Sequence, residues 1–217
     1  MNPGTTAVKT MIRPALALLL AMTVIAGFAY PLIVTGIAQV LFPRRANGSL
    51  IVEHGRPIGS RLIGQAFSAP RDFWGRPSAT LPRPYDALDS GGSNLGPLNP
   101  ALVAVVRARI AALHAADPGN RARVPVDLVT ASASGLDPDI SLAAAEYQAG
   151  RVARARGLPF ATVRAMIAAH AKHRWLGLFG EPRVNVLELN RALDAASTAR
   201  RGTRPPGAVA GRGAPDG

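Results

Sequence analysis

Residues 13–44 read RPALALLLAMTVIAGFAYPLIVTGIAQVLFPR, and the rest of the chain is organised around them. No charged residue lies between Arg13 and Arg44. A helix needs about 20 apolar residues to cross the core of a bilayer, so this stretch can span it and still tilt. Because a backbone in lipid must satisfy its own hydrogen bonds, we predict one transmembrane helix at residues 11–42. Pro31 predicts a kink within that helix.

The same stretch is too long for a cleaved signal peptide, whose apolar part has about 7 to 15 residues. No small-residue cleavage site precedes the change to polar sequence. No second stretch of the chain approaches this length. We therefore expect an uncleaved anchor that crosses the cell inner (plasma) membrane once.

The orientation of the anchor is predicted from the cations at its two ends. Lys9 and Arg13 flank one end, and Arg44 and Arg45 flank the other. The positive-inside rule counts short flanking loops and gives little weight to a long domain. The short basic N-terminal arm therefore favours a cytoplasmic N-terminus and a domain that is periplasmic or extracellular.

The rest of the chain predicts one soluble domain. The protein has 217 residues, and residues 43–198 suit a single domain. Residues 1–10 form a polar arm, and residues 199–217 form an Arg/Pro/Gly tail for which we expect disorder. The predicted fold class is α+β, with one N-terminal transmembrane helix followed by a single soluble α+β domain.

Composition excludes several classes of function. The net charge is +12, but the arginines are scattered among acidic residues and the chain has only two Trp and three Tyr. A nucleic-acid site prefers a basic stripe with aromatic residues beside it, so we expect no nucleic-acid partner. The basic excess fits a partner protein or an anionic membrane surface better. The absence of cysteine excludes disulfides, thiolate metal sites and cysteine nucleophiles.

Turn and capping signals predict strands and a helix in the first half of the domain. Residues 49–53 predict a short strand that leaves the membrane. Residues 60–67 form an apolar run that is more strand-like than helical. Asn99-Pro100 predicts a helix start, with Asn as the N-cap and Pro in the first turn, and Asp117 marks its end.

Three more helices are predicted in the second half. Asp137-Pro138 is a cap-and-proline start for an Ala-rich helix that stops at Gly157. Residues 159–173 predict the next helix. Asn185 has capping-box spacing to a Glu three residues later, which predicts a last helix that runs to about Ala196.

The first candidate ligand or partner loop consists of Ser90, Gly91, Gly92, Ser93 and Asn94. Its two glycines permit a backbone with positive φ and a close approach to a ligand. Successive amide N–H groups there could form an anion nest. A plain surface turn explains the same residues and stays open as the alternative.

The second candidate loop covers residues 130–135 and is rich in hydroxyl groups, from Thr130, Ser132 and Ser134. A loop of this kind before a helix N-terminus can bind an anion or a phosphate group. It can equally be a capping loop without a ligand. It lacks the Gly-x-x-x-x-Gly-Lys-Ser/Thr spacing of a P-loop, so the chain does not read as an ATPase by itself.

No catalytic set is expected. The sequence contains no Gly-x-Ser-x-Gly elbow and no pair of carboxylates in a diagnostic context. His170 and His173 are three residues apart on a predicted helix, but no zincin motif accompanies them. We therefore predict no catalytic residue and no metal.

Several strings occur in one order between about residues 11 and 195. They are Tyr30-Pro31, Asn47-Gly48-Ser49-Leu50, Leu62-Ile63-Gly64-Gln65, Phe73 with Arg76-Pro77-Ser78, Ser90 to Leu95, Val124 to Leu136, and Val184 to Asn190. Taken together, they resemble the C subunit of the Kdp-type high-affinity potassium-transporting ATPase. Each string alone is weakly specific, and their common order makes the resemblance specific.

The resemblance implies a non-catalytic accessory subunit of an ATP-driven potassium uptake pump. In that family a potassium-translocating channel-like subunit and a P-type ATP-hydrolysing subunit carry transport and chemistry. The C subunit stabilises the complex and acts as a catalytic chaperone that raises the ATP affinity of the hydrolysing subunit. The implied cofactor is ATP, shared with or acting through that partner, the implied transported ion is potassium, and the lipid bilayer is a further partner.

The residues that we assign to this role are the two candidate loops and Gln148, a polar side chain on the helix after the second loop. A domain outside the cell can influence ATP affinity only by allosteric coupling through the membrane subunits, whereas a domain inside could contact nucleotide directly. The alternative is an enzyme rather than an accessory subunit, namely a membrane-tethered hydrolase that uses the Ser/Thr-rich loops.

Overall fold

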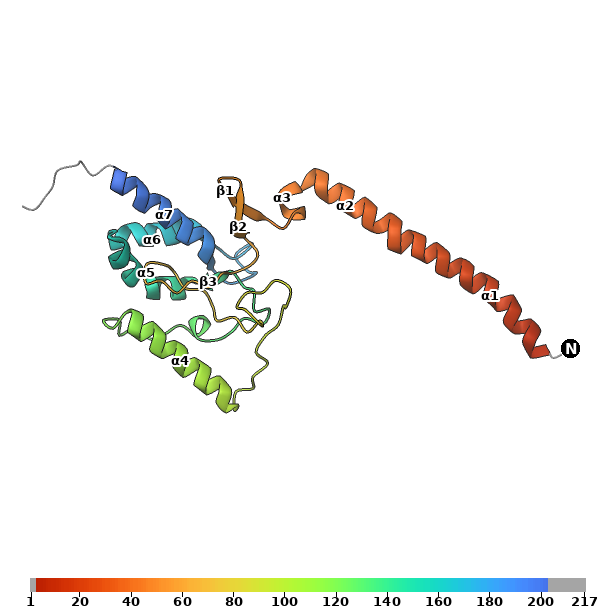
Figure 1. The fold of residues 1–217 in the computed structure, drawn as a ribbon, viewed down its shortest axis with the longest axis horizontal. Helices are drawn as coiled ribbons and strands as arrows, with labels where there is room; N and C mark the ends of the chain where they lie inside the picture. The colour runs from red at the N-terminus through yellow and green to blue at the C-terminus, as the bar shows by residue number, and fades with distance from the viewer. Residues whose placement is uncertain (1–2, 203–217) are drawn as a thin grey trace, which may run out of the picture. The chain divides into compact units, whose positions relative to one another are not determined.

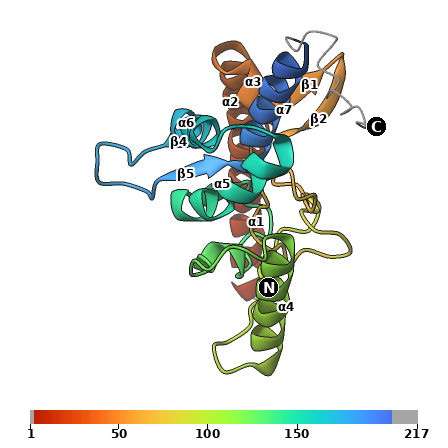
Figure 2. The same cartoon turned by 90° about the vertical axis from the view of Figure 1, so that its left-hand side faces the viewer.

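The structure is a computed structural model that describes residues 3–202. The chain divides into two compact units, and the boundary lies between Ile58 and Gly59. The N-terminal unit therefore includes residues 43–58, which the sequence assigns to the soluble domain. Figures 1 and 2 show the elements of both units, which are described here separately.

The N-terminal unit is dominated by one long apolar helix (Figure 1). It consists of α1 (Pro3–Met22), the π-helical segment η1 (Thr23–Ala29) and α2 (Tyr30–Leu41). The part from Thr10 to Leu41 is long and apolar enough to cross a membrane. This finding confirms the predicted apolar helix. The helix begins at Pro3, inside the arm that the sequence places before the anchor.

Close to Pro31, where the sequence predicts a kink, the structure changes its helix type. The π-helical segment η1 ends two residues before this proline. In a regular α-helix the proline ring would collide with the carbonyl group of Gly27, four residues earlier. A π-helical segment shifts the hydrogen bonds of that turn, and such segments are a known response to a disturbed helix ladder.

A short helix and a hairpin follow the apolar helix. They are α3 (Pro43–Ala46), β1 (Leu50–Glu53) and β2 (Arg56–Ser60), and the two strands form a two-stranded sheet. His54 and Gly55 have φ values of 49° and 76°, as a two-residue hairpin turn requires. The strand predicted at residues 49–53 is confirmed, but the strand-like run at 60–67 is wrong.

The reason for this error is the glycine at the centre of the run. Gly64 N–H donates to the carbonyl group of Leu136, not to a neighbouring strand. A Cβ atom on Gly64 would lie 2.3 Å from the ring of Tyr85. Residues 61–67 therefore pack as an irregular segment against another loop.

The second unit has the predicted α+β architecture. Its antiparallel sheet has the strand order β3-β5-β4, with Ile140 opposite Val184 and Ala171 also opposite Val184. The strands are β3 (Asp139–Ser141), β4 (Ala171–Lys172) and β5 (Arg183–Asn185). The helices are α4 (Pro100–Ala116), the 3-10 turn η2 (Val126–Leu128), α5 (Leu142–Arg156), α6 (Phe160–His170) and α7 (Val186–Gly202).

Local capping chemistry sets three of these helix ends as predicted. Asn99 Oδ1 accepts from the Ala101 N–H at the start of α4. Gly157 ends α5 with a left-handed φ of 63°. Asn185 Oδ1 accepts from the N–H of Glu188 at 3.0 Å, which is one half of the predicted capping box.

The helix start predicted at Asp137-Pro138 is wrong. Asp137 Oδ1 accepts from the N–H of Asp139 and forms a turn, after which the chain enters β3. The helix begins after Ser141, whose hydroxyl group accepts from the Ala144 N–H. Pairing of β3 with β5, a strand far along the chain, overrides the local cap signal at this point.

The last two helices also differ from their predicted lengths. Helix α6 ends at His170, because the next two residues pair with β5 as β4. Helix α7 continues to Gly202, beyond the predicted end near Ala196. Residues 203–217, most of the tail for which disorder is predicted, lie outside the described residues.

One apolar core holds this unit together. It lies between the three-stranded sheet, the helices α5, α6 and α7, and the irregular residues Phe73 and Trp74. Phe73 is fully buried although it belongs to no helix or strand. The backbone of residues 73 and 74 must therefore find hydrogen-bond partners inside the core.

Candidate functional site

The feature that organises the second unit is Ala69–Arg76, which we call the clamped segment. It contains no helix or strand. Each of its eight carbonyl oxygens nevertheless accepts a hydrogen bond from a side chain. The donors are Tyr85, Arg109, Gln148, Arg151, Arg156 and Asn190, together with Trp74 of the segment itself. Side chains thus replace the neighbouring strands that would pair with an extended backbone in a sheet.

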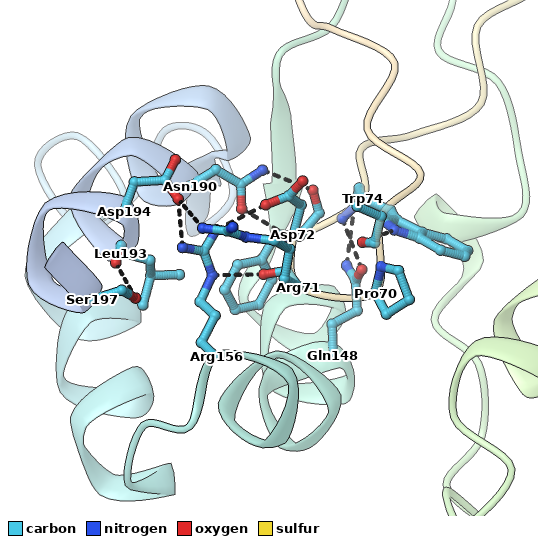
Figure 3. Close-up of polar contacts among 12 residues, drawn as sticks. Pro70, Arg71, Asp72, Trp74, Gln148, Arg156, Asn190, Leu193, Asp194 and Ser197 are labelled. Carbon is cyan, nitrogen blue, oxygen red and sulfur yellow. Dashed lines mark hydrogen bonds and ion pairs between the residues drawn. The ribbon is translucent and has the colours of Figure 1, made fainter. Parts of the chain in front are cut away.

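Two side-chain amides hold the buried centre of the clamped segment (Figure 3). Asn190 of α7 accepts from Phe73 N–H at 2.7 Å and donates to the Phe73 carbonyl group at 3.0 Å. Gln148 of α5 does the same for Trp74, at 2.8 and 3.1 Å. Each amide therefore satisfies both peptide groups of one buried residue, as a paired strand would.

Arginine side chains bind the carbonyl groups on either side of this centre. Arg151 of α5 donates to the carbonyl groups of Pro70 and Asp72. Arg109 of α4 donates to Gly75. Both guanidinium groups also lie over the ring of Trp74, at 5.2 Å for Arg109 and 4.7 Å for Arg151. Burial lowers the pKa of Arg151 to about 10, although the nearby carboxylates of Asp117 and Asp72 act to raise it.

An ion-pair network connects the start of the clamped segment to α7. The Arg156 side chain is almost fully buried and pairs with Asp72 at 2.8 Å and with Asp194 at 2.7 Å. Arg71 pairs with the same Asp194. Figure 3 shows these groups converging between α5 and α7. Because the buried cation is paired with two carboxylates, removing either acid would leave an incompletely neutralised charge.

The structure brings the two predicted loops together. The N–H group of Gly91 donates to the Ser134 carbonyl group at 2.9 Å, and the Ser90 hydroxyl group donates to the same oxygen at 3.2 Å. A Cβ atom on Gly92 would lie 2.9 Å from the carbonyl oxygen of Ala133. The second glycine is therefore needed for a close contact between two loops of the same chain.

The other predicted loop residues have local roles. Thr130 donates its hydroxyl group to the Val126 carbonyl group, and Ser134 accepts from Leu136 N–H. Ser132 is buried, whereas Ser93 and Asn94 are exposed. Asn94 has a positive φ of 51°. The hydroxyl groups of Thr130 and Ser134 are thus bonded to backbone groups of their own chain.

Gln148, the remaining predicted site residue, lies in the core. Its amide makes four hydrogen bonds: two with Trp74, one to the Ala144 carbonyl group and one from Arg151. Two N–H groups and two acceptor positions are the usual capacity of such an amide. The side chain therefore has no hydrogen-bonding group left for an external ligand.

Asn190 and Arg109 are members of this arrangement that the sequence does not predict. A signal for Asn190 existed, because it falls four residues after Val186 and three before Leu193, on the apolar face of α7. A short polar residue on such a face must find a buried partner. Arg109 has no comparable local signal on α4.

Two of the cavities in the described residues border the clamped segment. One, of about 790 Å³, is lined by the Asp117–Arg154 ion pair and by Tyr147, whose hydroxyl group is buried without a hydrogen-bond partner among residues 3–202. The other, of about 460 Å³, is lined by both acidic and basic side chains. Its charged lining residues are Arg76, Asp127, Asp137, Asp139, Glu181 and Arg183. Two of these carboxylates are paired with arginines of the same lining, Asp137 with Arg76 and Asp139 with Arg183.

Comparison with known proteins gives one consistent result. Residues 12–195 match the family described as K+-transporting ATPase, c chain (KdpC). Relatives named potassium-transporting ATPase KdpC subunit come from Methylibium petroleiphilum, Polaromonas naphthalenivorans and Variovorax paradoxus, and are 66%, 65% and 64% identical to this chain. The matches cover 86%, 86% and 88% of this chain and 97%, 95% and 100% of the relatives.

Proposed function

The chain belongs to the family of the c chain of the K+-transporting ATPase, and from this premise we propose that it is an accessory subunit that stabilises the pump and raises its ATP affinity. Its relatives are named as subunits of a potassium-transporting ATPase, so potassium is the ion that the complex transports. The partners that we propose are a potassium-translocating channel-like subunit and a P-type subunit that hydrolyses ATP.

The observation that carries this proposal is the hydrogen bonding of the hydroxyl groups in the two predicted loops. The hydroxyl groups of Ser90, Thr130 and Ser134 are bonded to backbone groups. A nucleophilic hydroxyl needs a base within hydrogen-bond reach, and backbone groups cannot supply one. This bonding favours a binding surface over the membrane-tethered hydrolase that the sequence leaves open.

The proposed effect on ATP is allosteric. With the domain outside the cell, this chain influences the nucleotide site only if it binds one conformation of the membrane subunits better than another. Coupling free energies of this kind are about 1–3 kcal/mol, or about 5- to 150-fold in affinity.

The experiment is ATP titration of the purified, lipid-reconstituted pump. We expect pump that contains Gly92→Ala to need several-fold more ATP for half-maximal activity, with a smaller change in kcat. The reason is that a Cβ atom at this position pushes the two loops apart. Gly91→Ala is the matched control, because its Cβ atom meets nothing within 4 Å. Equal ATP dependence of both variants and wild type would remove the loops from the proposal.

A second arm tests the role of the chain itself. Pump depleted of this chain, and then supplied with it again, should lose and regain ATP affinity. If added chain restores the amount of intact complex but leaves the ATP dependence unchanged, the subunit only stabilises the pump. These two results separate the stabilising role from the role in ATP affinity.

A further inference from the structure

The connection between β4 and β5 exposes a group of large apolar side chains. Trp175, Leu176, Leu178 and Phe179, which we call the apolar knob, are 69%, 71%, 77% and 61% exposed. Figure 2 shows this connection projecting from the body of the domain beyond β4 and β5. Scattered apolar residues on a surface need no explanation, but four within five positions of a projecting loop indicate a binding surface.

The knob has a defined shape. Trp175 and Phe179 exchange two backbone hydrogen bonds, of 2.8 and 3.0 Å, and their ring centroids are 5.7 Å apart. Between them, Leu176 and Gly177 have φ values of 52° and 73°. A leucine with positive φ is uncommon and strained, and such strain persists where the surrounding structure enforces it. The closed turn therefore presents the apolar side chains in a preorganised arrangement.

Charge at the base of the knob argues against a lipid surface as the occupant. Arg174 pairs with Glu181 at 2.8 Å, and Arg183 pairs with Asp139 at 2.9 Å. Lys172 also lies 4.0 Å from Asp139. Aromatic segments that bind anionic membranes rely on cations that are free for the headgroups. Here the cations beside the knob have carboxylate partners on their own chain, so an apolar protein pocket fits better.

The size of the knob limits the kind of protein partner. A large aromatic side chain can bury about 150–250 Å², so the knob offers on the order of 500 Å². A stable interface between free proteins buries about 800 Å² on each partner. The knob alone is too small to hold a second copy of this chain. Its partner must be kept close by another contact, which raises the effective concentration of the two surfaces.

We propose that the apolar knob inserts into an apolar pocket on another subunit of the same pump and anchors the soluble domain to it. The apolar helix Thr10–Leu41 supplies the second contact, since it places this chain in the same membrane as its partners. This inference rests on the proposed function only in that the chain is a pump subunit. It does not depend on any effect on ATP.

The test compares two pairs of leucines in the complete pump. The double variant Leu176→Ser/Leu178→Ser removes half of the knob. The control Leu88→Ser/Leu98→Ser changes two leucines that are 96% and 95% exposed elsewhere in the domain. Each tagged variant is expressed together with an untagged wild-type chain, and both compete for the pump. We expect the knob variant to enter the complex about tenfold less often, and the control to compete like wild type.

Trp175 reports its own surroundings, because the chain has two tryptophans and the other, Trp74, is only 6% exposed. In the assembled pump we expect Trp175 emission at shorter wavelength than in the free chain held in a nanodisc. A Trp175→Phe variant of each sample provides the background from Trp74 and from tryptophans of the other subunits. This variant keeps an aromatic ring in the turn, and each spectrum is scaled to the amount of this chain in the sample.

Three results would overturn the docking proposal. They are equal incorporation of the knob and control variants, quenching of Trp175 by brominated lipid in the free chain, or a dimer of this chain that the knob variant abolishes. The second result would assign the knob to the bilayer and the third to a second copy. If the knob variant is excluded from the pump but ATP affinity never depends on this chain, docking stands and the proposed effect on ATP fails.

Discussion

Replacing Asn190 with leucine tests the central claim about the fold, that amide side chains take the place of neighbouring strands. Asn190 is 2% exposed, and its amide bonds both the N–H and the carbonyl group of the fully buried Phe73. Leucine has the same branched shape and the same number of side-chain heavy atoms, but no polar atom. The variant Asn190→Leu therefore removes the hydrogen bonding while it keeps the branching of the side chain.

The expected magnitude follows from the two groups that lose their partners. A buried backbone donor or acceptor without a partner costs about 1–3 kcal/mol, so the two peptide groups of Phe73 cost about 2–6 kcal/mol together. Additional apolar burial by leucine offsets part of this loss. We expect a net loss of about 3 kcal/mol, a large part of the 5–15 kcal/mol that is typical for a whole domain.

The assay is urea unfolding of the full chain in detergent micelles, followed by the fluorescence of Trp74 in a Trp175→Phe background. Asn99→Leu is the control, because this exposed N-cap has one capping hydrogen bond, from Ala101 N–H, and its loss costs about 1 kcal/mol. Trp74 lies next to Phe73 in the core, so its emission reports release of the clamped segment. A loss for Asn190→Leu no larger than that for Asn99→Leu would show that the amide of Asn190 does not hold the clamped segment.

A double variant sharpens the same test. Gln148→Leu removes the equivalent bonds to Trp74 and should cost at least as much as Asn190→Leu. When the loss of one amide has already displaced the segment, removal of the second amide breaks fewer intact hydrogen bonds. We therefore expect the double variant to lose less than the sum of the single losses. Simple additivity would mean that the two amides act on the segment independently.

Three further predictions concern the loops, the alkaline limit of stability and the orientation. Gly92→Ala should lower the free energy of unfolding by about 1–3 kcal/mol while Gly91→Ala changes it little, as urea midpoints would show. Burial raises the pKa of Tyr85 above its ordinary value of 10, so the unfolded chain loses this proton first. The free energy of unfolding should thus fall as the pH rises above about 10. Tyr85→Phe should remove the part of this fall that Tyr85 causes, as urea-unfolding midpoints measured from about pH 8 to about pH 11 would show. With no native cysteine, Leu88→Cys should react with an impermeant maleimide on intact cells if the domain is outside, whereas the buried Ser197→Cys should stay unlabelled in both intact and opened cells.

Features decided by a few neighbouring residues could be predicted from the sequence. The apolar helix follows from the uncharged stretch itself, and the ends at Asn99, Gly157 and Asn185 follow from capping chemistry within three residues. The false helix start at Asp137 shows the limit. A cap signal there is overridden by pairing of β3 with β5, and nothing near residue 137 reveals a partner strand so far along the chain.

The clamped segment was beyond sequence reasoning for the same physical reason. Phe73 and Asn190 are 117 positions apart, and Trp74 and Gln148 are 74 apart. Gln148 is conspicuous in the sequence as a polar residue on an Ala-rich helix, but the sequence does not say whether such a residue faces a ligand or the backbone of its own chain. Likewise, the sequence indicates the glycine-rich loop and the hydroxyl-rich loop separately, but it does not indicate the contact between them.

The clamped segment also determines how functional effects should be interpreted. Its last residue, Arg76, pairs with Asp137 at 3.1 Å and donates to the carbonyl group of Ala131 in the second loop. Displacing the segment therefore displaces that loop as well. A change at Gln148 would alter pump activity through this connection even though its amide has no bonding capacity left for nucleotide. An ATP effect of a Gln148 variant thus cannot identify a nucleotide contact, whereas a difference between Gly92→Ala and Gly91→Ala tests the loop contact itself.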